Sequence, residues 1–326
     1  MVQEVTIDLR RAPHQRWVLT PAQGEQAREL LRQYKTELGL RPDLGELLIS
    51  LGRKHIRDEY WAEMESLAVT LALPVSEVAL CNFYYDATKV VLGRALGCTA
   101  FAIDGAEGVL HARNLDWWTE NFALGRMTTL CHFVGGAAGR FTTVGWPGFV
   151  GAFSGIAPGR VAVTLNAVLS SEPTQAATPV ELLLRTVLEE ARSFEEARAV
   201  LSESPIPCDC LLLLTGVGPG EIAVIERTPS RFGIRDAQSG YVCVTNGYQR
   251  LDAGLGGGPS ELLGSWCQRF ERVNALMRER RPESAEDCFG YLSDAAVRMN
   301  MTVQQMVFRA ATGEYWVRIP GPAEGG

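Results

Sequence analysis

A cysteine that directly follows a glycine, Cys98, has the clearest chemical potential in this sequence. If the peptide bond between Gly97 and Cys98 is cut, the cysteine gains a free α-amine whose reference pKa is about 7.7 to 8.0. Such an amine can act as a base toward the thiol of its own residue near neutral pH. Gly97 has no Cβ and accepts unusual backbone angles, which helps the thiol reach the Gly97 carbonyl and start an N-to-S acyl shift. The pair therefore predicts a chain that cuts itself before Cys98.

Two short β-rich runs beside Cys98 place further functional groups next to it. The runs TAFAI and GVLHAR are joined by residues 104–108, a connection of hairpin length. A turn centred on Ala106 pairs residues whose numbers sum to about 212, which sets Cys98 beside Arg113 and Asp116. We expect Arg113 to favour the thiolate and hold a developing anion, and Asp116 to anchor the new ammonium or position the amine as a base. Without Cys98, the same two charges would indicate only a surface ion pair at a strand end.

The elements that must position these groups follow from hydrophobic patterning. A short strand over 5–9 precedes a helical stretch over 21–91, and strands broken by glycine begin at Thr99. A capping-box spacing with proline at the first helical position opens a helix that begins at Thr178 and runs to about Leu201. Hairpins rather than βαβ units favour antiparallel sheets layered with helices, which is an α+β fold. The remaining predicted strands and helices lie at 128–134, 140–146, 160–169, 211–217, 221–228, 240–246, 261–280, 283–298, 302–308 and 314–319.

Composition narrows the classes of partner. The net charge of −7 is spread along the chain, which argues against nucleic acid and anionic membrane and favours a small molecule. The first residues lack the apolar core of a signal peptide and no run of about 18 apolar residues occurs, so we expect a cytoplasmic protein without stable membrane insertion. Four histidines without a zinc-type spacing predict no metal, and nothing predicts another cofactor. Most other cysteines should be packed hydrophobic residues: Cys81, Cys131, Cys243, Cys267 and Cys288.

The segments GCTAF at 97–101 and HARNLD at 111–116 resemble the N-terminal-nucleophile cysteine hydrolases of the acid ceramidase and N-acylethanolamine acid amidase group. The spacing of 15 residues from Cys98 to Arg113 and 18 to Asp116 is part of that resemblance. Penicillin acyltransferase and the choloylglycine hydrolases are related to the same group. Four further segments extend the likeness in order along the chain: VTIDLRRAPHQRW, CNFYYD, PGRVAVTLNAV and VCVTNGYQR.

The resemblance implies an αββα sandwich of two antiparallel sheets between helical layers. Residues 1–97 would form a helical N-terminal segment packed on the core, and 98–326 the catalytic core, as one composite globular unit. It also implies an autocatalytic cut before Cys98 and hydrolysis of a linear N-acyl amide through a thioester acyl-enzyme. The absence of a secretion signal is consistent with a bacterial, cytoplasmic member of the group.

The resemblance also assigns the residues of the site. It places Arg113 and Asp116 beside the nucleophile, and it matches Asn246 to an asparagine that lends its side chain to the oxyanion hole. In other enzymes one such donor contributes roughly 3 kcal/mol to transition-state stabilisation. Asn166 and Arg269 are further matches in the site. Asn166 and Asn246 also suit the ends of strands, because asparagine is common at turns.

Three functions stay open at this point. The first is hydrolysis of the acyl-enzyme by water, and the second is transfer of the acyl group from the same thioester to an amine. The third is a non-catalytic binding protein that keeps the fold and is never cut. Five aromatic residues should be divided between the core and an acyl pocket: Trp117, Trp118, Trp146, Phe149 and Phe153.

Overall fold

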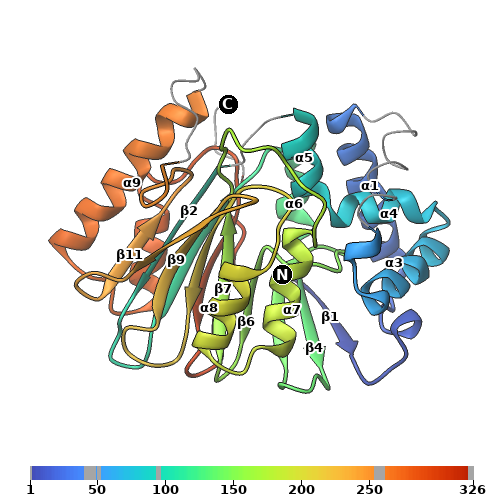
Figure 1. Ribbon diagram of the computed structural model, residues 1–326, viewed down its shortest axis with the longest axis horizontal. Coiled ribbons are helices and arrows are strands. Elements are labelled where there is room, and N and C mark those ends of the chain that lie inside the picture. The colour runs from blue at the N-terminus through green and yellow to red at the C-terminus, as the bar shows by residue number, and fades with distance from the viewer. Residues whose placement is uncertain (1, 40–48, 50–52, 93–96, 253–260, 322–326) are drawn as a thin grey trace.

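Two β-sheets lie at the centre of the protein, and helices cover the outer face of each (Figure 1). The computed structural model describes residues 2–39, 49, 53–92, 97–252 and 261–321. The larger sheet contains eight strands and the smaller sheet contains five. The predicted α+β arrangement of helices, two sheets and helices is therefore confirmed.

The larger sheet has the strand order β1-β4-β5-β6-β7-β8-β9-β10. The pairing of β1 with β4 is parallel, so the prediction of a purely antiparallel sheet is wrong for that pair. A hairpin forces neighbouring strands to run antiparallel, but helices and other strands separate β1 from β4 along the chain. Two of its strands, β6 and β10, were not predicted from the sequence. The bounds are β1 Gln3–Asp8, β4 Thr129–Val134, β5 Phe141–Gly145, β6 Ser154–Ala157, β7 Val161–Asn166, β8 Cys210–Thr215, β9 Ile222–Arg227 and β10 Phe232–Asp236.

The smaller sheet has the order β11-β2-β3-β12-β13, and every pair in it is antiparallel. Each residue of β2, β3 and β12 is buried. Both faces of these strands are covered, because the larger sheet packs on one side and two helices pack on the other. The bounds are β11 Tyr241–Val244, β2 Gly97–Ile103, β3 Leu110–Asp116, β12 Thr302–Arg309 and β13 Glu314–Arg318.

Two pairs of helices form the outer layers. Helices α7, Val180–Glu190, and α8, Phe194–Glu203, pack on the larger sheet, whereas α9, Glu261–Glu279, and α10, Ala285–Leu292, pack on the smaller one. Figure 1 shows α7 and α8 in front of the larger sheet and α9 at the left, beside β11 and β2 of the smaller sheet. The sequence predicts a helix over 283–298. In the structure the corresponding helix, α10, ends earlier, at Leu292.

The helix predicted over 178–201 is two helices, and its predicted capping box does not form. The chain leaves the helical conformation at Ala191, and Ser193 caps the second helix by accepting a hydrogen bond from the backbone of Glu196. Glu181, the expected capping partner, is fully buried and accepts instead from the backbone N–H of Tyr85. The Thr178 hydroxyl donates to the carbonyl of His55. Tertiary contacts with the N-terminal helices therefore replace the local cap.

The N-terminal helices gather at one side of the sandwich, at the right of Figure 1. They are α1 Pro21–Leu38, α3 Asp58–Leu71, α4 Val75–Asn82 and α5 Tyr84–Leu92. Helix α1 begins with a complete capping box formed by Thr20 and Gln23. Residues 40–48 and 50–52 of the predicted helical stretch lie outside the described residues. The described residues also contain four short segments: η1 Pro13–Gln15, η2 Arg53–His55, η3 Glu120–Phe122 and α6 Ala123–Arg126.

A buried ion pair joins these helices to the sandwich. Both oxygens of Glu63 on α3 accept from the guanidinium of Arg185 on α7, at 2.5 and 2.7 Å, and both side chains are fully buried. Arg16 and Trp17 donate to the same carboxylate, each at 2.8 Å. Burial alone would raise the pKa of Glu63, but Arg185 and the hydrogen bonds lower it overall. The carboxylate therefore stays ionised with its partners in place.

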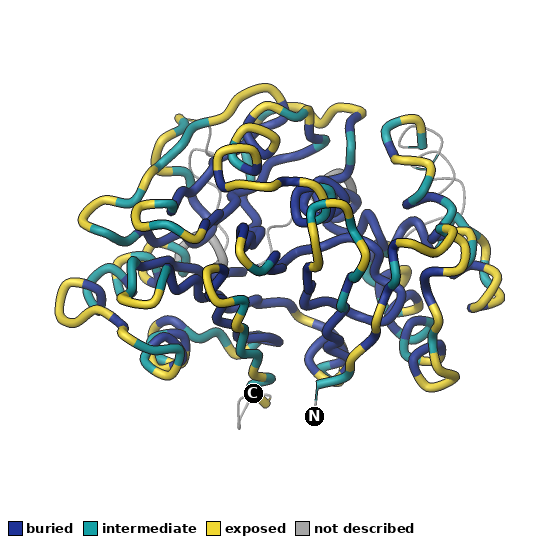
Figure 2. The backbone as a smooth tube through the Cα atoms, turned by 90° about the horizontal axis from the view of Figure 1, so that it is seen from below, coloured by how far each residue is buried: buried dark blue, intermediate teal, exposed yellow. Residues whose placement is uncertain are grey.

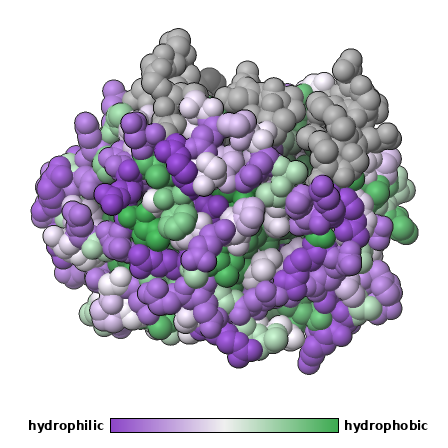
Figure 3. All heavy atoms as spheres, in the orientation of Figure 1, coloured by the Kyte–Doolittle hydropathy of each residue, from purple (hydrophilic) through white to green (hydrophobic). Residues whose placement is uncertain are grey.

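The interior is continuous from the larger sheet into the N-terminal helices, and exposed residues lie in loops, on outer helix faces and on the edge strands (Figure 2). The face seen in Figure 3 is mostly hydrophilic, and its apolar side chains form separate small patches. Within the described residues, each helix is either too short or too polar to cross a membrane.

We predict that Glu63→Gln destabilises the fold by about 3–5 kcal/mol, because it removes the hydrogen-bonded counter-charge of a fully buried arginine, which keeps only Glu189 at 3.6 Å. The measurement is urea unfolding in a chain that also carries Cys98→Ala, so that the expected cut cannot split the unfolding reaction. Glu25→Gln is the control, because Glu25 pairs with Arg28 on the surface, and it should leave the unfolding midpoint unchanged. Folding lowers the Glu63 pKa, so wild type should lose this stabilisation as the pH falls below the usual glutamate range. Equal midpoints for the two variants would contradict the role of the ion pair.

Candidate active site

The predicted hairpin of β2 and β3 forms, with a register one residue away from the expected one. Cys98 lies opposite Leu115, Ala100 opposite Arg113, and Gly97 opposite Asp116. Paired residues of antiparallel strands point to the same face, and successive residues alternate. Local pairing alone therefore brings Cys98, Arg113 and Asp116 to one end of the hairpin.

The alternation separates these groups between the two faces of the smaller sheet. Cys98 and Arg113 point toward the larger sheet, where the guanidinium binds the carbonyl of Phe153, just before β6, and that of Leu165 on β7. Gly97 and Asp116 point to the other face, which α9 and α10 cover. The peptide bond between Gly97 and Cys98 thus lies between a thiol on one face and a carboxyl group on the other.

The guanidinium of Arg113 holds the thiol. Its Nη2 lies 3.4 Å from the Sγ of Cys98 and also donates to the carbonyl of Leu165. Its Nη1 donates to the carbonyl of Phe153 at 3.0 Å and to the hydroxyl of Ser154. Both residues are buried. A fully buried cation with fixed partners is well placed to stabilise a thiolate or another anion at that sulfur.

Asn246 and Arg269 hold the backbone of the nucleophile. The Oδ1 of Asn246 accepts from the backbone nitrogen of Cys98 at 3.0 Å and from Nη2 of Arg269 at 2.8 Å. Nη1 of Arg269 donates to the carbonyl of Cys98 at 2.6 Å and to the hydroxyl of Thr99 at 2.7 Å. The Nδ2 of Asn246 donates to the carbonyl of Ala167 at 2.8 Å. The amide oxygen of Asn246 therefore faces the nitrogen that a cut would turn into an amine.

Asn166 lies at the edge of the site, at the end of β7. Its Nδ2 donates to the carbonyls of Val244 and Thr245, at 3.2 and 3.0 Å. These two residues directly precede Asn246, so the side chain supports the segment that carries Asn246. Its contacts with Val244 and Thr245 connect the larger sheet to β11 of the smaller one.

Asp116 is a fully buried carboxyl group beside Gly97. Its Oδ1 accepts from the Thr302 hydroxyl at 2.6 Å, and its Oδ2 lies 3.9 Å from Nη1 of Arg269. A Cβ built on Gly97 would lie 3.0 Å from the Cβ of Asp116 and 3.4 Å from its Oδ2. Burial raises the pKa of Asp116, while Arg269, Thr302 and Arg113 act in the opposite direction. The group is thus an acid–base candidate next to the bond expected to be cut.

The sequence did not identify Thr302, Ser154 or Thr99 as parts of the site. Thr302 opens a strand that was predicted, but its pairing with β3 joins segments 186 residues apart. Ser154 belongs to a strand that was not predicted. In the described part of the chain, histidine, cysteine, aspartate and glutamate nowhere gather in groups of three or more that could hold a metal ion.

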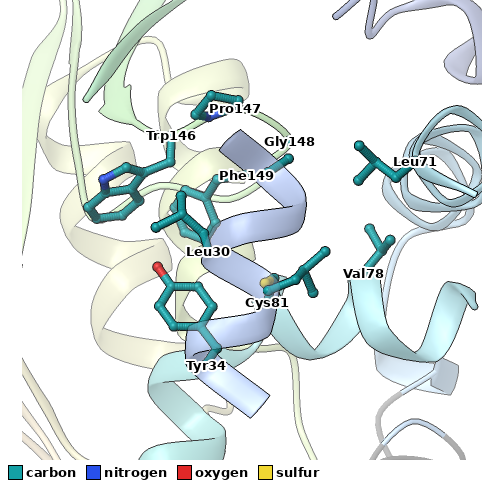
Figure 4. A pocket seen from close by; sticks show the side chains of 11 residues that line it. Leu30, Tyr34, Leu71, Val78, Cys81, Trp146, Pro147, Gly148 and Phe149 are labelled. Atoms are coloured by element: carbon teal, nitrogen blue, oxygen red, sulfur yellow. The ribbon is translucent and has the colours of Figure 1, made fainter. Parts of the chain in front are cut away.

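An apolar pocket lies between the N-terminal helices and the turn at 146–149 (Figure 4). Trp146 and Phe149 line it, and their rings lie 6.0 and 5.1 Å from that of Phe153. Phe153 also contacts Trp117 and supplies a carbonyl to Arg113. Trp118, in contrast, is 64% exposed. The pocket lining is completed by Ala27, Leu30, Leu31, Tyr34, Leu71, Val78, Cys81, Pro147 and Gly148.

The two stacked sheets between helical layers, with the nucleophile candidate on a central strand, define the N-terminal-nucleophile hydrolase fold. The solved structure of the N-acylethanolamine-hydrolyzing acid amidase ortholog from Caenorhabditis elegans has this fold and aligns with a TM-score of 0.54 at 21% identity. The alignment covers 68% of this chain and all of that chain.

The chain belongs to the acyl-coenzyme A:6-aminopenicillanic acid acyl-transferase family, which matches residues 103–306. It is also similar to the acid ceramidase of Balaenoptera acutorostrata scammoni, with 28% identity over 189 residues, 51% of this chain and 46% of that protein. The N-acylethanolamine-hydrolyzing acid amidase of Caenorhabditis elegans is 26% identical over 189 residues, 53% of this chain and 52% of that protein. The matches therefore span about half the length of these two relatives.

We predict that Gly97→Ala destabilises the fold by about 1–3 kcal/mol, because the site has no room for a Cβ. The new atom would lie 2.8 Å from the Sδ of Met299, which can move, and 3.0 Å from the Cβ of Asp116, which is held in a buried strand. Urea unfolding in the Cys98→Ala background measures the effect. Gly290→Ala in α10 is the control, because a Cβ there meets no atom within 4 Å. The packing argument fails if the two substitutions have the same effect.

Proposed function

We propose that this protein is a self-processing cysteine amidase that cleaves linear N-acyl amides through a thioester at Cys98. One observation carries the proposal: both reactive atoms of Cys98 have a buried partner. Its Sγ lies 3.4 Å from Nη2 of Arg113, and its nitrogen lies 3.0 Å from Oδ1 of Asn246. A cysteine that only packs in a core needs neither contact. Family membership and the names of the similar proteins, acid ceramidase and N-acylethanolamine-hydrolyzing acid amidase, support the same reaction class.

In the proposed self-cleavage, the Cys98 thiol adds to the Gly97 carbonyl, so that a C–S bond forms and the C–N bond then breaks. The thiol proton is lost to the site and a proton is added to the Cys98 nitrogen. Water then attacks the thioester, which frees the thiol of Cys98 and the carboxyl group of Gly97. The missing Cβ at Gly97 keeps its carbonyl accessible. The cut would divide the chain into 1–97 and 98–326.

In the proposed turnover, the new α-amine takes the thiol proton and the sulfur attacks the carbonyl of the substrate amide. Arg113 stabilises the anion at sulfur, and the amine returns the proton to the leaving amine. Asn246 holds the α-amine through its Oδ1, with Arg269 fixing the orientation of that oxygen. The Nδ2 of Asn246 donates to the carbonyl of Ala167, and the same amide group is the proposed donor to the oxyanion.

The pocket of Figure 4 suggests the nature of the acyl group. Its lining is almost wholly apolar, and two lining residues, Trp146 and Phe149, pack against Phe153, whose backbone carbonyl binds Arg113. A carbonyl carbon bound at Cys98 would have its chain directed along Phe153 toward Trp146 and Phe149. We propose that the acyl part of the substrate is an apolar chain whose end reaches this pocket, where burial of each CH₂ contributes about 0.8 kcal/mol. The cavity is about 20 Å³, so the lining side chains must move apart to admit more than the end of the chain.

Acyl transfer is the second candidate function, because the matching family is described as an acyl-transferase. The same thioester would form, but an amine instead of water would attack it. The two reactions differ only in the acceptor of the acyl group. Adding hydroxylamine to an assay with a single amide separates them, since a transferase accumulates the hydroxamate faster than the free acid.

We predict that the wild-type chain yields two fragments separated before Cys98, and that Cys98→Ala stays whole and does not hydrolyse N-acyl amides. The reason is that the substitution removes the only atom proposed to attack Gly97. Intact mass and a denaturing gel give the result directly. Cys267→Ala is the matched control, because Cys267 is exposed on α9, contrary to its predicted burial. A whole wild-type chain without amidase activity would favour the non-catalytic binding protein.

The acyl pocket gives a separate prediction. Ala27→Leu places a larger side chain in the pocket and should lower kcat/KM for long-chain acyl amides at least tenfold more than for acetyl amides. Ala22→Leu, at an exposed position of the same helix, should change neither value. A uniform loss across chain lengths would show that the pocket does not hold the acyl chain.

A further inference from the structure

The carboxyl group of Asp116 shares a hydrogen-bonded unit with the turn that precedes β12. The Thr302 hydroxyl lies 2.6 Å from Oδ1 of Asp116 and 2.8 Å from the carbonyl of Met299. The same hydroxyl accepts from the backbone nitrogen of Met299 at 3.1 Å. Thr302 and Asp116 are both buried, and their strands pair directly at this position.

The Thr302 hydroxyl has two oxygen partners but only one proton to share between them. A threonine hydroxyl has one proton to donate and two lone pairs that can accept. One lone pair takes the N–H of Met299, which leaves one lone pair and the proton for two oxygen partners, Asp116 and the Met299 carbonyl. If Asp116 is ionised, the hydroxyl donates to it. If Asp116 is protonated, it donates to the hydroxyl, which then donates to the Met299 carbonyl. Each protonation state of Asp116 has a complete set of partners at Thr302.

We propose that Thr302 is a positioning residue that holds Asp116 beside the Gly97–Cys98 bond in both of its protonation states. The proposal rests on the self-cleavage proposed above and assigns a part of it. During the cut, the carboxylate of Asp116 takes up, through a bridging water molecule, the proton that the thiol loses on the opposite face of the sheet. The resulting acid returns a proton to the Cys98 nitrogen as the C–N bond breaks. Asp116 ends the step ionised, opposite the new amine, and no other reactant is needed.

The surroundings of Asp116 fit a group that changes its protonation state. Burial raises its pKa above the usual aspartate value, and the lowering influences come from Arg269 on α9, the Thr302 hydroxyl on β12 and Arg113 on β3. The thiol of Cys98 on β2 is the titratable neighbour within the site. Opposing influences of this kind keep both the acid and its carboxylate accessible, as an acid–base group requires.

The test compares the rate of self-cleavage of freshly translated full-length chain across pH for wild type, Thr302→Val and Thr302→Ser. Valine has nearly the same shape as threonine but removes the hydroxyl, whereas serine retains it. Without the hydroxyl, the ionised form of Asp116 loses a hydrogen bond, so its pKa rises further. We expect the acidic limb of the Thr302→Val profile to move upward by about one pH unit, a tenfold lower rate on that limb. Thr302→Ser keeps the hydroxyl, so its self-cleavage rate should stay within about threefold of the wild-type rate across the pH range. A threefold difference is roughly the effect of one weak contact.

Unfolding midpoints of the three chains in the Cys98→Ala background separate a local effect from misfolding. An unshifted profile for Thr302→Val, or equal slowing by valine and serine, overturns the assignment of Thr302 while leaving the proposed function intact. If the wild-type chain is never cut, the proposed function itself fails and this inference fails with it. A shift in Thr302→Val that serine reverses supports the inference.

Discussion

Backbone pairing between β2 and β3 sets the direction of the Cys98 thiol and brings Arg113 to it. Because successive residues of a strand point to opposite faces, the thiol is directed between the two sheets, and the preceding residue faces the helices. Arg113 reaches the sulfur from the same strand pair, and Asp116 reaches Gly97 from the opposite face. A slip of one residue would exchange the two faces and separate the thiol from its guanidinium. The remaining elements act by keeping this hairpin buried and in register.

Partners from distant parts of the chain complete the arrangement. Arg269 on α9 binds the carbonyl of Cys98 and the amide oxygen of Asn246, and thus connects a helix, the end of a strand and the nucleophile. Asn166 connects β7 to the residues before Asn246. These hydrogen bonds are made by buried polar groups, which are costly to leave without partners. The surrounding fold must therefore supply hydrogen-bond partners for the polar groups of the site as well as bury the hydrophobic core.

The hairpin, most of the strand positions and the layered α+β fold could be predicted from the sequence because they depend on local patterning and on a short connection. Thr302 and Ser154 could not be predicted, since their places depend on which strands become neighbours across long separations. The capping box predicted at Thr178 does not form, and here a long-range contact overrides a local pattern. Its pattern is local, but the buried contact between Glu181 and the backbone of Tyr85 takes precedence. The roles of the six predicted site residues stay predictions, although the structure brings five of them into one connected network and places Asn166 beside it.

The first strand, β1, has a consequence for how the molecule could recover from denaturation. Although it precedes the proposed cut, it forms an edge of the larger sheet through its pairing with β4, and the Glu63–Arg185 ion pair crosses the same boundary. Cleavage would therefore leave two polypeptides that share one sheet and one buried ion pair. The uncut chain can refold in a reaction within one molecule, at a rate independent of dilution. The cut protein must first bring two polypeptides together, so its maturation would convert reversible folding into a bimolecular assembly that dilute solution makes slow.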